Sequence, residues 1–255
     1  MSLFVNKVFL SKEKELKNYI NNFDSLGKLF GDGKRNTIKL FDLEDKIVNI
    51  KSFKIPHLIN KIAYKYFRKS KARRSFEYAN MLIDKGIGTP EPIAYFENYN
   101  FIGIKESYYI SQHLECDLTF RELVEKPDYP NHTIILRQFT QFTFDLHEKG
   151  IEFLDHSSGN TLIKKVSENQ YQFFLVDLNR MNFHQTMGFD LRMKNFGRLT
   201  PKEEMIAIMS NEYSKLYTSQ NEKDVFEKML YFTNQFQEEL FRKRQLKKKL
   251  KFWKK

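Results

Sequence analysis

The chain is poor in several features that would place it in other classes of protein. Cysteine occurs once, at Cys116, which excludes an intrachain disulfide and suits a reducing cytoplasm. The 10 glycines and 6 prolines are too few for a flexible string of domains. No apolar run approaches the ~20 residues of a transmembrane helix, and the N-terminus meets charge too early for a signal peptide. We therefore expect a cytoplasmic protein.

Positive charge is what the chain has in excess. The net charge is +11, and residues 242–255 carry nine Lys or Arg in fourteen positions with no acid. Such a segment favours a polyanionic partner. Leu246, Leu250 and Trp253 recur in it at i, i+4 and i+7, which predicts an amphipathic helix on an anionic membrane surface. A solvated tail is the alternative, and nucleic acid is not the expected partner.

One polar pattern carries the chemistry. Asp155 precedes Asn160 by five positions, and Asp177 ends an apolar run after a polar turn. Phosphoryl transfer needs a carboxylate that accepts the proton of the attacking hydroxyl, and an amide oxygen and a second carboxylate that hold magnesium. The catalytic loop of kinases spaces its base and its asparagine in this way. The pattern predicts Asp155 as the base and Asn160 and Asp177 as metal ligands; two ordinary surface loops are the alternative.

The order of the expected elements indicates the fold. Strands are expected over residues 6–10, 37–43, 46–53, 92–97, 101–114, 161–163 and 171–176, with hairpin turns near residues 44–45 and 98–100. Helices are expected over residues 13–23, 59–67, 71–85, 119–125, 133–149, 190–217 and 222–250, the first of them capped by Ser11. A strand-rich first half with one main helix and a helical second half predict an α+β, bilobal protein-kinase-like fold.

The expected domain is single and spans residues 1–255. Its N-lobe would cover about residues 1–115, its C-lobe about 116–241, and a basic tail 242–255. The catalytic segments would lie at the floor of the cleft between the lobes.

A kinase also needs a lysine on an N-lobe strand that contacts the nucleotide phosphates, and a helix glutamate that orients it. Lys51 is the favoured lysine because it follows a V-x-I pattern, and Lys54 is the second candidate. In the helix expected over 71–85, Glu77 is the one suitably placed acid, and it lies four residues after Arg73. A surface ion pair is the alternative role for Glu77.

Phosphates also need a turn that offers free backbone N–H groups. Gly31 and Gly33 lie just before the first strand of the expected 37–53 hairpin and can form such a nest. The third glycine of the usual phosphate loop is replaced by Asn36, so a simple tight turn is the alternative.

The chain resembles a known family at this point. The segments that carry the resemblance are residues 51–54, 67–77, 88–92, 146–151, 176–180 and 195–199, in this order. Together they look like the lipopolysaccharide kinases, which phosphorylate Kdo or heptose sugars of the inner core. The resemblance implies a protein-kinase-like fold that uses ATP and Mg2+. By matching positions it implies that Lys51 holds the phosphates, Glu77 orients it, Asp155 is the base, and Asn160 and Asp177 bind the metal.

Two positions depart from the usual pattern. The histidine normally found two residues before the catalytic aspartate is Phe153, and Asp177 is followed by Leu178-Asn179 instead of Phe-Gly. The first change removes a group that supports the loop.

These observations predict an ATP-dependent sugar kinase. Its acceptor would be a Kdo or heptose hydroxyl of the lipopolysaccharide core or of its lipid A–Kdo precursor, and it would act peripherally at the inner face of the inner membrane. A membrane-associated pseudokinase scaffold and a phosphotransferase of the aminoglycoside or choline kinase type are the alternatives. The latter predicts an acidic pocket for a cationic acceptor, whereas this chain is basic.

Overall fold

The computed structural model describes residues 2–31, 36–54 and 68–252. The chain divides into two compact units. Unit 1 comprises residues 1–115 and 176–180, and unit 2 comprises residues 116–175 and 181–255. The short segment 176–180 therefore belongs to unit 1, although the chain on both sides of it belongs to unit 2.

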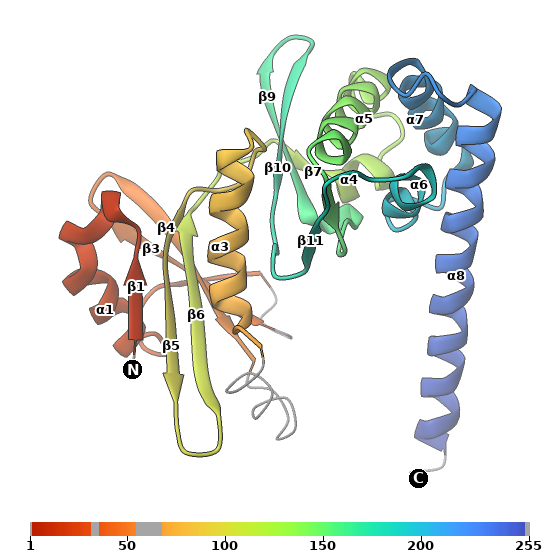
Figure 1. The fold of residues 1–255 in the computed structure, drawn as a ribbon. Helices are drawn as coiled ribbons and strands as arrows, with labels where there is room; N and C mark the ends of the chain where they lie inside the picture. The colour runs from red at the N-terminus through yellow and green to blue at the C-terminus, as the bar shows by residue number, and fades with distance from the viewer. Residues whose placement is uncertain (1, 32–35, 55–67, 253–255) are drawn as a thin grey trace. The chain divides into compact units, whose positions relative to one another are not determined.

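Unit 1 is built on an antiparallel sheet of six strands in the order β1-β5-β6-β4-β3-β2. The strands are β1 (Ser2–Val5), β2 (Lys28–Phe30), β3 (Asn36–Leu43), β4 (Lys46–Phe53), β5 (Pro92–Tyr99) and β6 (Ile104–Gln112), as Figure 1 shows. The predicted hairpin of β3 and β4 is confirmed. The two strands pair along their whole length, and Glu44 takes a positive φ of 55° in the turn between them.

The helices of unit 1 are η1 (Lys7–Lys12), α1 (Glu13–Asn21) and α3 (Lys71–Asp84). The last is the predicted central helix: the Ser70 side chain caps it by accepting the N–H of Arg73, and Gly86 with a φ of 70° follows its end. Leu16 of α1 joins a buried cluster that includes Val48 and Ile50 of β4. α3 packs against β5 and β6.

Three local predictions for unit 1 are wrong. Residues 6–10 lie at the start of a 3-10 helix and not in a strand: the Asn6 carbonyl oxygen accepts the N–H of Phe9 at 2.8 Å, and the Asn6 side chain caps the turn at the N–H of Val8. Since η1 runs directly into α1, Ser11 does not cap that helix. The β5–β6 turn lies at residues 100–103, where the Asn100 side chain accepts two backbone N–H groups. The helix predicted over residues 59–67 lies outside the described residues.

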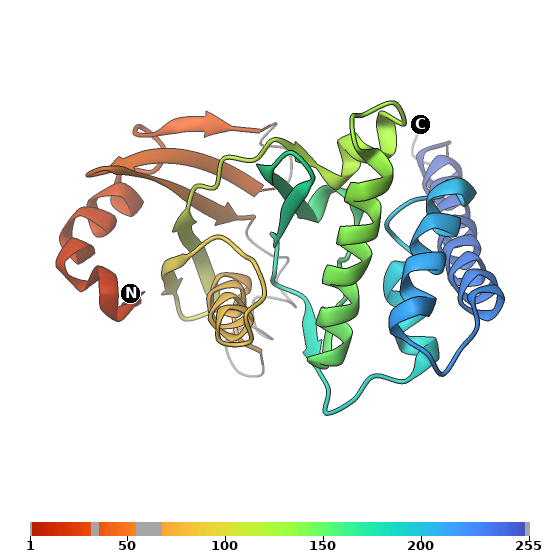
Figure 2. The ribbon, with the colours of Figure 1, turned by 90° about the horizontal axis from the view of Figure 1, so that it is seen from above.

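Unit 2 is mainly helical. Its helices are α4 (Phe120–Glu125), α5 (His132–Glu148), η2 (Ser158–Asn160), α6 (Phe189–Phe196), α7 (Glu203–Leu216) and α8 (Glu222–Phe252). Its strands are β7 (Leu118–Thr119), β8 (Ile151–Phe153), β9 (Thr161–Ser167), β10 (Gln170–Leu175) and β11 (Met181–Phe183). β10, β9 and β7 form one small sheet and β11 with β8 another. Figure 2 shows α5, α7 and α8 packed side by side, in agreement with their contacts.

The predicted hairpin of residues 161–176 is confirmed as β9 and β10, and both strands extend to a tighter turn than expected. The helix expected over residues 190–217 is two helices, α6 and α7, because the chain breaks after Phe196. At Gly197 an added Cβ would lie 2.9 Å from the carbonyl oxygen of Phe232 in α8. Glycine at this position therefore allows the two segments to approach closely.

No described helix is long and apolar enough to cross a membrane. The C-terminal part of α8 is exposed on all sides: residues 241–249 are all solvent-accessible, including Phe241 at 63% and Leu246 at 60%.

Candidate active site

In unit 1 the fold joins two predicted site residues that are far apart in the sequence. The Lys51 ammonium lies 2.7 Å from Oδ1 of Asp177. The Lys51 side chain is only 12% exposed, and its ammonium lies over the ring of Phe53, 5.3 Å from the centroid. Val48 and Ile50 point to the opposite face and are fully buried, as the alternation of β4 predicts. Lys54 lies exposed beyond the end of β4. The lysine that reaches Asp177 is therefore Lys51.

Asp177 itself has an unusual backbone. Its φ is 60°, a left-handed value that few residues other than glycine adopt. Such a conformation costs on the order of 1–3 kcal/mol and tends to occur at functional sites. Asn179 donates its side-chain N–H to Oδ1 of Asp177 at 2.6 Å, the same oxygen that Lys51 contacts. Leu178 between them is buried. The Leu-Asn pair that replaces Phe-Gly thus provides an apolar anchor and a polar support for the aspartate.

Glu77 is engaged elsewhere. Its carboxylate accepts hydrogen bonds from Lys69 at 2.8 Å and from Arg73 at 2.9 Å. Burial alone raises the pKa of the Glu77 carboxyl, but the hydrogen bonds from Lys69 and Arg73 outweigh it, so the pKa lies below its usual value. Among the described residues, the structure does not bring Glu77 to Lys51. Its orienting role stays a prediction, and the observed pairing is the ion pair of the alternative interpretation.

The predicted phosphate turn is described only in part. Gly31 follows β2 with a φ of 83° and has open space where a side chain would stand. Gly33 lies outside the described residues. The positive φ explains the glycine at position 31, and its contact with phosphates stays a prediction.

In unit 2 the predicted catalytic loop folds back on itself between β8 and β9. The side-chain amide of Asn160 donates to the carbonyl oxygen of Asp155 at 2.8 Å. That same carbonyl accepts the N–H of Ser157 at 2.7 Å. These bonds fix the two predicted residues relative to each other. They use the amide nitrogen of Asn160, while the amide oxygen is the atom that a metal ion would bind.

Asn195 of α6 and Arg198, just beyond the end of α6, hold this loop. Asn195 donates to the carbonyl oxygen of Phe153 at 2.9 Å. One guanidinium nitrogen of Arg198 lies 2.7 Å from the carbonyl oxygen of Leu154 and 2.7 Å from Oδ1 of Asp155. The predicted base is therefore paired with a cation that sequence reasoning did not assign. Residues 195–199 stood out only as part of the family resemblance.

A chain of buried polar groups extends behind Asn195. His147 contacts Oδ1 of Asn195 through Nε2 at 3.3 Å and the hydroxyl of Tyr213 through Nδ1 at 2.9 Å. Burial lowers the pKa of His147 to about 3. The neutral ring then donates from Nε2 to the amide oxygen and accepts from the tyrosine hydroxyl. His147 thus orients the asparagine that holds the loop.

The position of Phe153 is fully buried, as is His156, which directly follows the predicted base. The His156 ring lies 5.7 Å from the ring of Phe153 and 5.6 Å from that of Phe139. Neither ring nitrogen of His156 has a hydrogen-bond partner among the described residues. Burial lowers its pKa to about 4. The side chains on both sides of Leu154-Asp155 therefore anchor the loop mainly by apolar packing.

The residues present suit magnesium. Asp177 and Asn160 offer oxygen ligands, the type that Mg2+ binds through one or two carboxylates together with phosphates and water. In the described part of the chain, no group of three or more His, Cys, Asp or Glu side chains could hold a metal without such help. Each unit thus contributes one predicted oxygen ligand, of the type that suits a metal ion carried by nucleotide phosphates.

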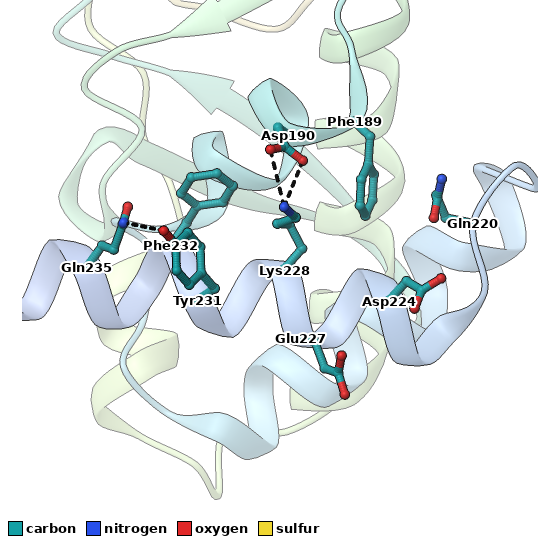
Figure 3. A pocket seen from close by; sticks show the side chains of 9 residues that line it. All are labelled: Phe189, Asp190, Gln220, Asp224, Glu227, Lys228, Tyr231, Phe232 and Gln235. Carbon is teal, nitrogen blue, oxygen red and sulfur yellow. Dashed lines mark hydrogen bonds and ion pairs between the residues drawn. The ribbon is translucent and has the colours of Figure 1, made fainter.

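An open pocket of about 660 Å³ lies elsewhere in unit 2, along the first half of α8 (Figure 3). Phe189, Tyr231 and Phe232 give it aromatic walls, and Lys228 pairs there with Asp190 at 3.1 Å. None of the predicted site residues lines it. It is therefore separate from the catalytic loop.

Comparison with known proteins defines the fold. The sequence matches no protein-family model and no curated protein. Among solved structures the chain is similar to WaaP in complex with acyl carrier protein, with a TM-score of 0.64 and 13% identity over 94% of this chain and 100% of that one. Together with the strand-rich first part and the helical second part, this likeness places the chain among proteins of the α+β protein-kinase-like fold.

Proposed function

We propose that the protein is a kinase that transfers the γ-phosphate of ATP to a Kdo or heptose hydroxyl of the lipopolysaccharide inner core. The observation that carries the proposal is the Lys51–Asp177 ion pair. In a kinase-like fold a strand lysine and an aspartate after a buried hairpin are the groups that meet the phosphates and their metal. The loop from Asp155 to Asn160 supplies the base and the second oxygen ligand.

Each residue has a chemical role in the proposed reaction. Asp155 accepts the proton of the acceptor hydroxyl. The oxygen attacks the γ-phosphorus, the bond to the β-phosphate oxygen breaks, and ADP leaves. Lys51 offers its ammonium to the phosphates, and Asp177 and Asn160 offer oxygen ligands to magnesium. When bound, magnesium neutralises charge on the phosphates.

One cation beside the loop favours an acceptor that carries an anionic group. Gly159 lies against Arg121 of α4: a Cβ added to Gly159 would lie 2.5 Å from the guanidinium. Arg121 is exposed. A carboxylate or phosphate on the sugar would pair with it. An acceptor of the aminoglycoside or choline type is cationic and would be repelled.

Phosphate incorporation tests the proposal. Purified protein with ATP and magnesium should add one phosphate to a Kdo- or heptose-bearing core lipid, measured by mass spectrometry, and should leave a cationic aminoglycoside unmodified. Asp155→Asn serves as the inactive control. Phosphorylation of the aminoglycoside alone would favour the small-molecule phosphotransferase, and nucleotide binding without any product would favour the pseudokinase.

We also propose that the end of α8 holds the protein on an anionic membrane surface, where a lipid-linked acceptor resides. Glu238–Arg242 and Glu239–Lys243 pair at 3.3 and 3.1 Å, but no acid follows them. The cations of residues 244–249 therefore stand beside like charges on an exposed helix, an unfavourable arrangement that an anionic surface relieves. The exposed Phe241 and Leu246 suit the lipid interface.

Vesicle sedimentation tests this location. Replacement of Lys247, Lys248 and Lys249 by glutamate should weaken binding to vesicles with anionic lipid, while the matched replacement of Lys14, Lys17 and Lys164, also exposed, should not. Equal binding of both variants would contradict the proposal. The alternative partner for the basic end of α8 is acyl carrier protein, which is bound in the solved WaaP structure. Added to the vesicle assay, it would compete for the basic end if it binds there.

A further inference from the structure

The catalytic loop lacks the two side chains that normally brace it. Kinase loops carry histidine and arginine in the two positions before the catalytic aspartate. Here these positions are Phe153 and Leu154, neither of which offers a polar side chain. A base must nevertheless be held within about 0.5 Å of its working position to be effective. The support must come from another part of unit 2.

The segment after α6 supplies it. Asn195 and Arg198 together bind three consecutive residues of the loop: the carbonyl oxygens of Phe153 and Leu154 and the carboxylate of Asp155. The bond from Arg198 to the carboxylate, at 2.7 Å, joins two partly buried side chains that are 34% and 20% exposed. Since one nitrogen of Arg198 contacts both the loop backbone and the carboxylate, it fixes the side-chain direction of Asp155 relative to its own backbone.

Arg198 is in turn held by α8. Its guanidinium lies over the ring of Phe236, 5.2 Å from the centroid. One turn earlier on the same helix, the carbonyl oxygen of Phe232 lies against Gly197, so close that a Cβ there would stand 2.9 Å away. Gly197 lets α8 approach, and this approach brings Phe236 over the arginine. Stacking on an aromatic ring suits the planar guanidinium and leaves its N–H groups free to bind the loop.

We propose that Arg198 is the positioning residue for Asp155 and that it replaces the missing brace of the loop, with Phe236 of α8 holding the arginine in place. This inference rests on the proposed function of Asp155 as the base. Arg198 acts through the carboxylate and not on the nucleotide. The middle of α8 therefore supports the catalytic loop through Phe236, whereas its exposed basic end has the separate membrane role proposed above.

The test combines turnover with a readout that does not depend on activity. In Arg198→Ala, kcat should fall by about tenfold to 100-fold, as expected for a misplaced catalytic group, while KM for ATP stays unchanged. Amide hydrogen exchange should quicken at residues 154–160 and remain slow in α5. Arg198→Lys should recover part of kcat, because a lysine keeps the charge but lacks the planar fork. Phe236→Leu should lower kcat in the same way but by a smaller factor.

Arg137→Gln is the matched control. Arg137 is 36% exposed and binds Glu212 at 2.8 Å, so it resembles Arg198 in exposure and pairing but does not touch the loop. An equal loss of kcat in Arg137→Gln would show a merely structural role and overturn the inference. Unchanged exchange at residues 154–160 in Arg198→Ala would overturn it too. If wild-type protein transfers no phosphate, the proposed function fails, while the exchange measurement still decides whether Arg198 holds the loop.

Discussion

Unit 1 and unit 2 hold their parts of the predicted catalytic set in different ways. In unit 1 a single ion pair joins Lys51 to Asp177, and Glu77 binds Lys69 and Arg73 instead. In unit 2 the loop that carries Asp155 and Asn160 is fixed by bonds within the loop and by further bonds from α6 and the residue Arg198 beyond it. In unit 1 Lys51 and Asp177 are joined by one ion pair, and Asp177 has Asn179 as a further support. In unit 2 the loop is held by several hydrogen bonds from two segments of the chain.

This difference separates binding from turnover. A partly exposed ion pair contributes only about 0–1 kcal/mol to stability, so the phosphates and metal of a nucleotide can redirect both of its members at little cost. A network of buried hydrogen bonds is expensive to rearrange. Changes in unit 1 should therefore act on nucleotide binding and turnover with little effect on folding, and changes in unit 2 should act on turnover or on stability.

The largest effect is expected at the base. Asp155→Asn should lower kcat by about 10²–10⁴-fold, the usual contribution of a general base, and should leave ATP affinity nearly unchanged because the base contacts the acceptor. Steady-state kinetics and nucleotide titration measure the two quantities. Asp145→Asn, which removes an acid that pairs with Lys149 on α5, is the control. A loss well below tenfold would indicate that another residue is the base.

The next effect concerns unit 1. Lys51→Ala should weaken ATP binding and lower turnover by orders of magnitude while the unfolding midpoint stays within a few degrees, because the ammonium serves the phosphates and not the core. Lys54→Ala should be close to wild type, since Lys54 is exposed beyond β4. The reverse outcome would show that the phosphate lysine is Lys54, and two silent substitutions would favour the pseudokinase.

Glu77 sharpens the comparison, because its predicted role requires a change of partner. If it turns from Lys69 and Arg73 to Lys51 during turnover, Glu77→Gln should lower kcat, and the double variant with Lys51→Ala should be no worse than Lys51→Ala alone. Additive losses in the cycle would mean that Glu77 only holds the surface ion pair seen in the structure.

A smaller effect is expected on the stability of unit 2 at acid pH. Burial lowers the pKa of His147 to about 3 and that of His156 to about 4. Below pH ~6.5 the unfolded chain binds protons at these positions that the folded chain does not, so the free energy of unfolding should fall as pH falls towards 4, by at most about 1.4 kcal/mol per pH unit for each group. Denaturant unfolding at several pH values measures this slope.

His156→Phe isolates one of the two groups. The ring of His156 packs on Phe139 and Phe153 without a hydrogen-bond partner among the described residues, so phenylalanine should be tolerated at pH 7. The variant should lose less stability than wild type between pH 6.5 and 4. An unchanged slope would mean that His156 does not titrate in this range of the unfolding equilibrium.

The sequence was sufficient for the features that local periodicity determines. Alternation along β4 placed Lys51 on the face that reaches Asp177, and the apolar pattern before Asp177 predicted the hairpin of β9 and β10. The metal role of Asp177 and the catalytic role of the loop stay predictions. The strand predicted over residues 6–10 was wrong because the chain turns at Asn6, where the carbonyl oxygen accepts the N–H of Phe9.

The support of the site could not be predicted in the same way. Asn195 and Arg198 bind residues more than forty positions earlier, and no local pattern indicates such bonds. Gly197 is the one local indication in this region: a glycine within a helical pattern marks a break or a close approach, and here it marks both. Sequence patterns can indicate candidate site residues, whereas the residues that support them are determined by tertiary contacts.

We propose, as the claim to be tested first, that the magnesium bound with the nucleotide uses both Asn160 and Asp177 as ligands. The most direct measurement is a double-mutant cycle. Titration calorimetry measures the magnesium-dependent binding of ATP to the wild type, to Asn160→Ala, to Asp177→Ala and to the double variant. A shared metal predicts that each single change weakens binding and that the double change is much less than additive. Fully additive losses, or ATP binding that does not depend on magnesium in the wild type, would contradict the account.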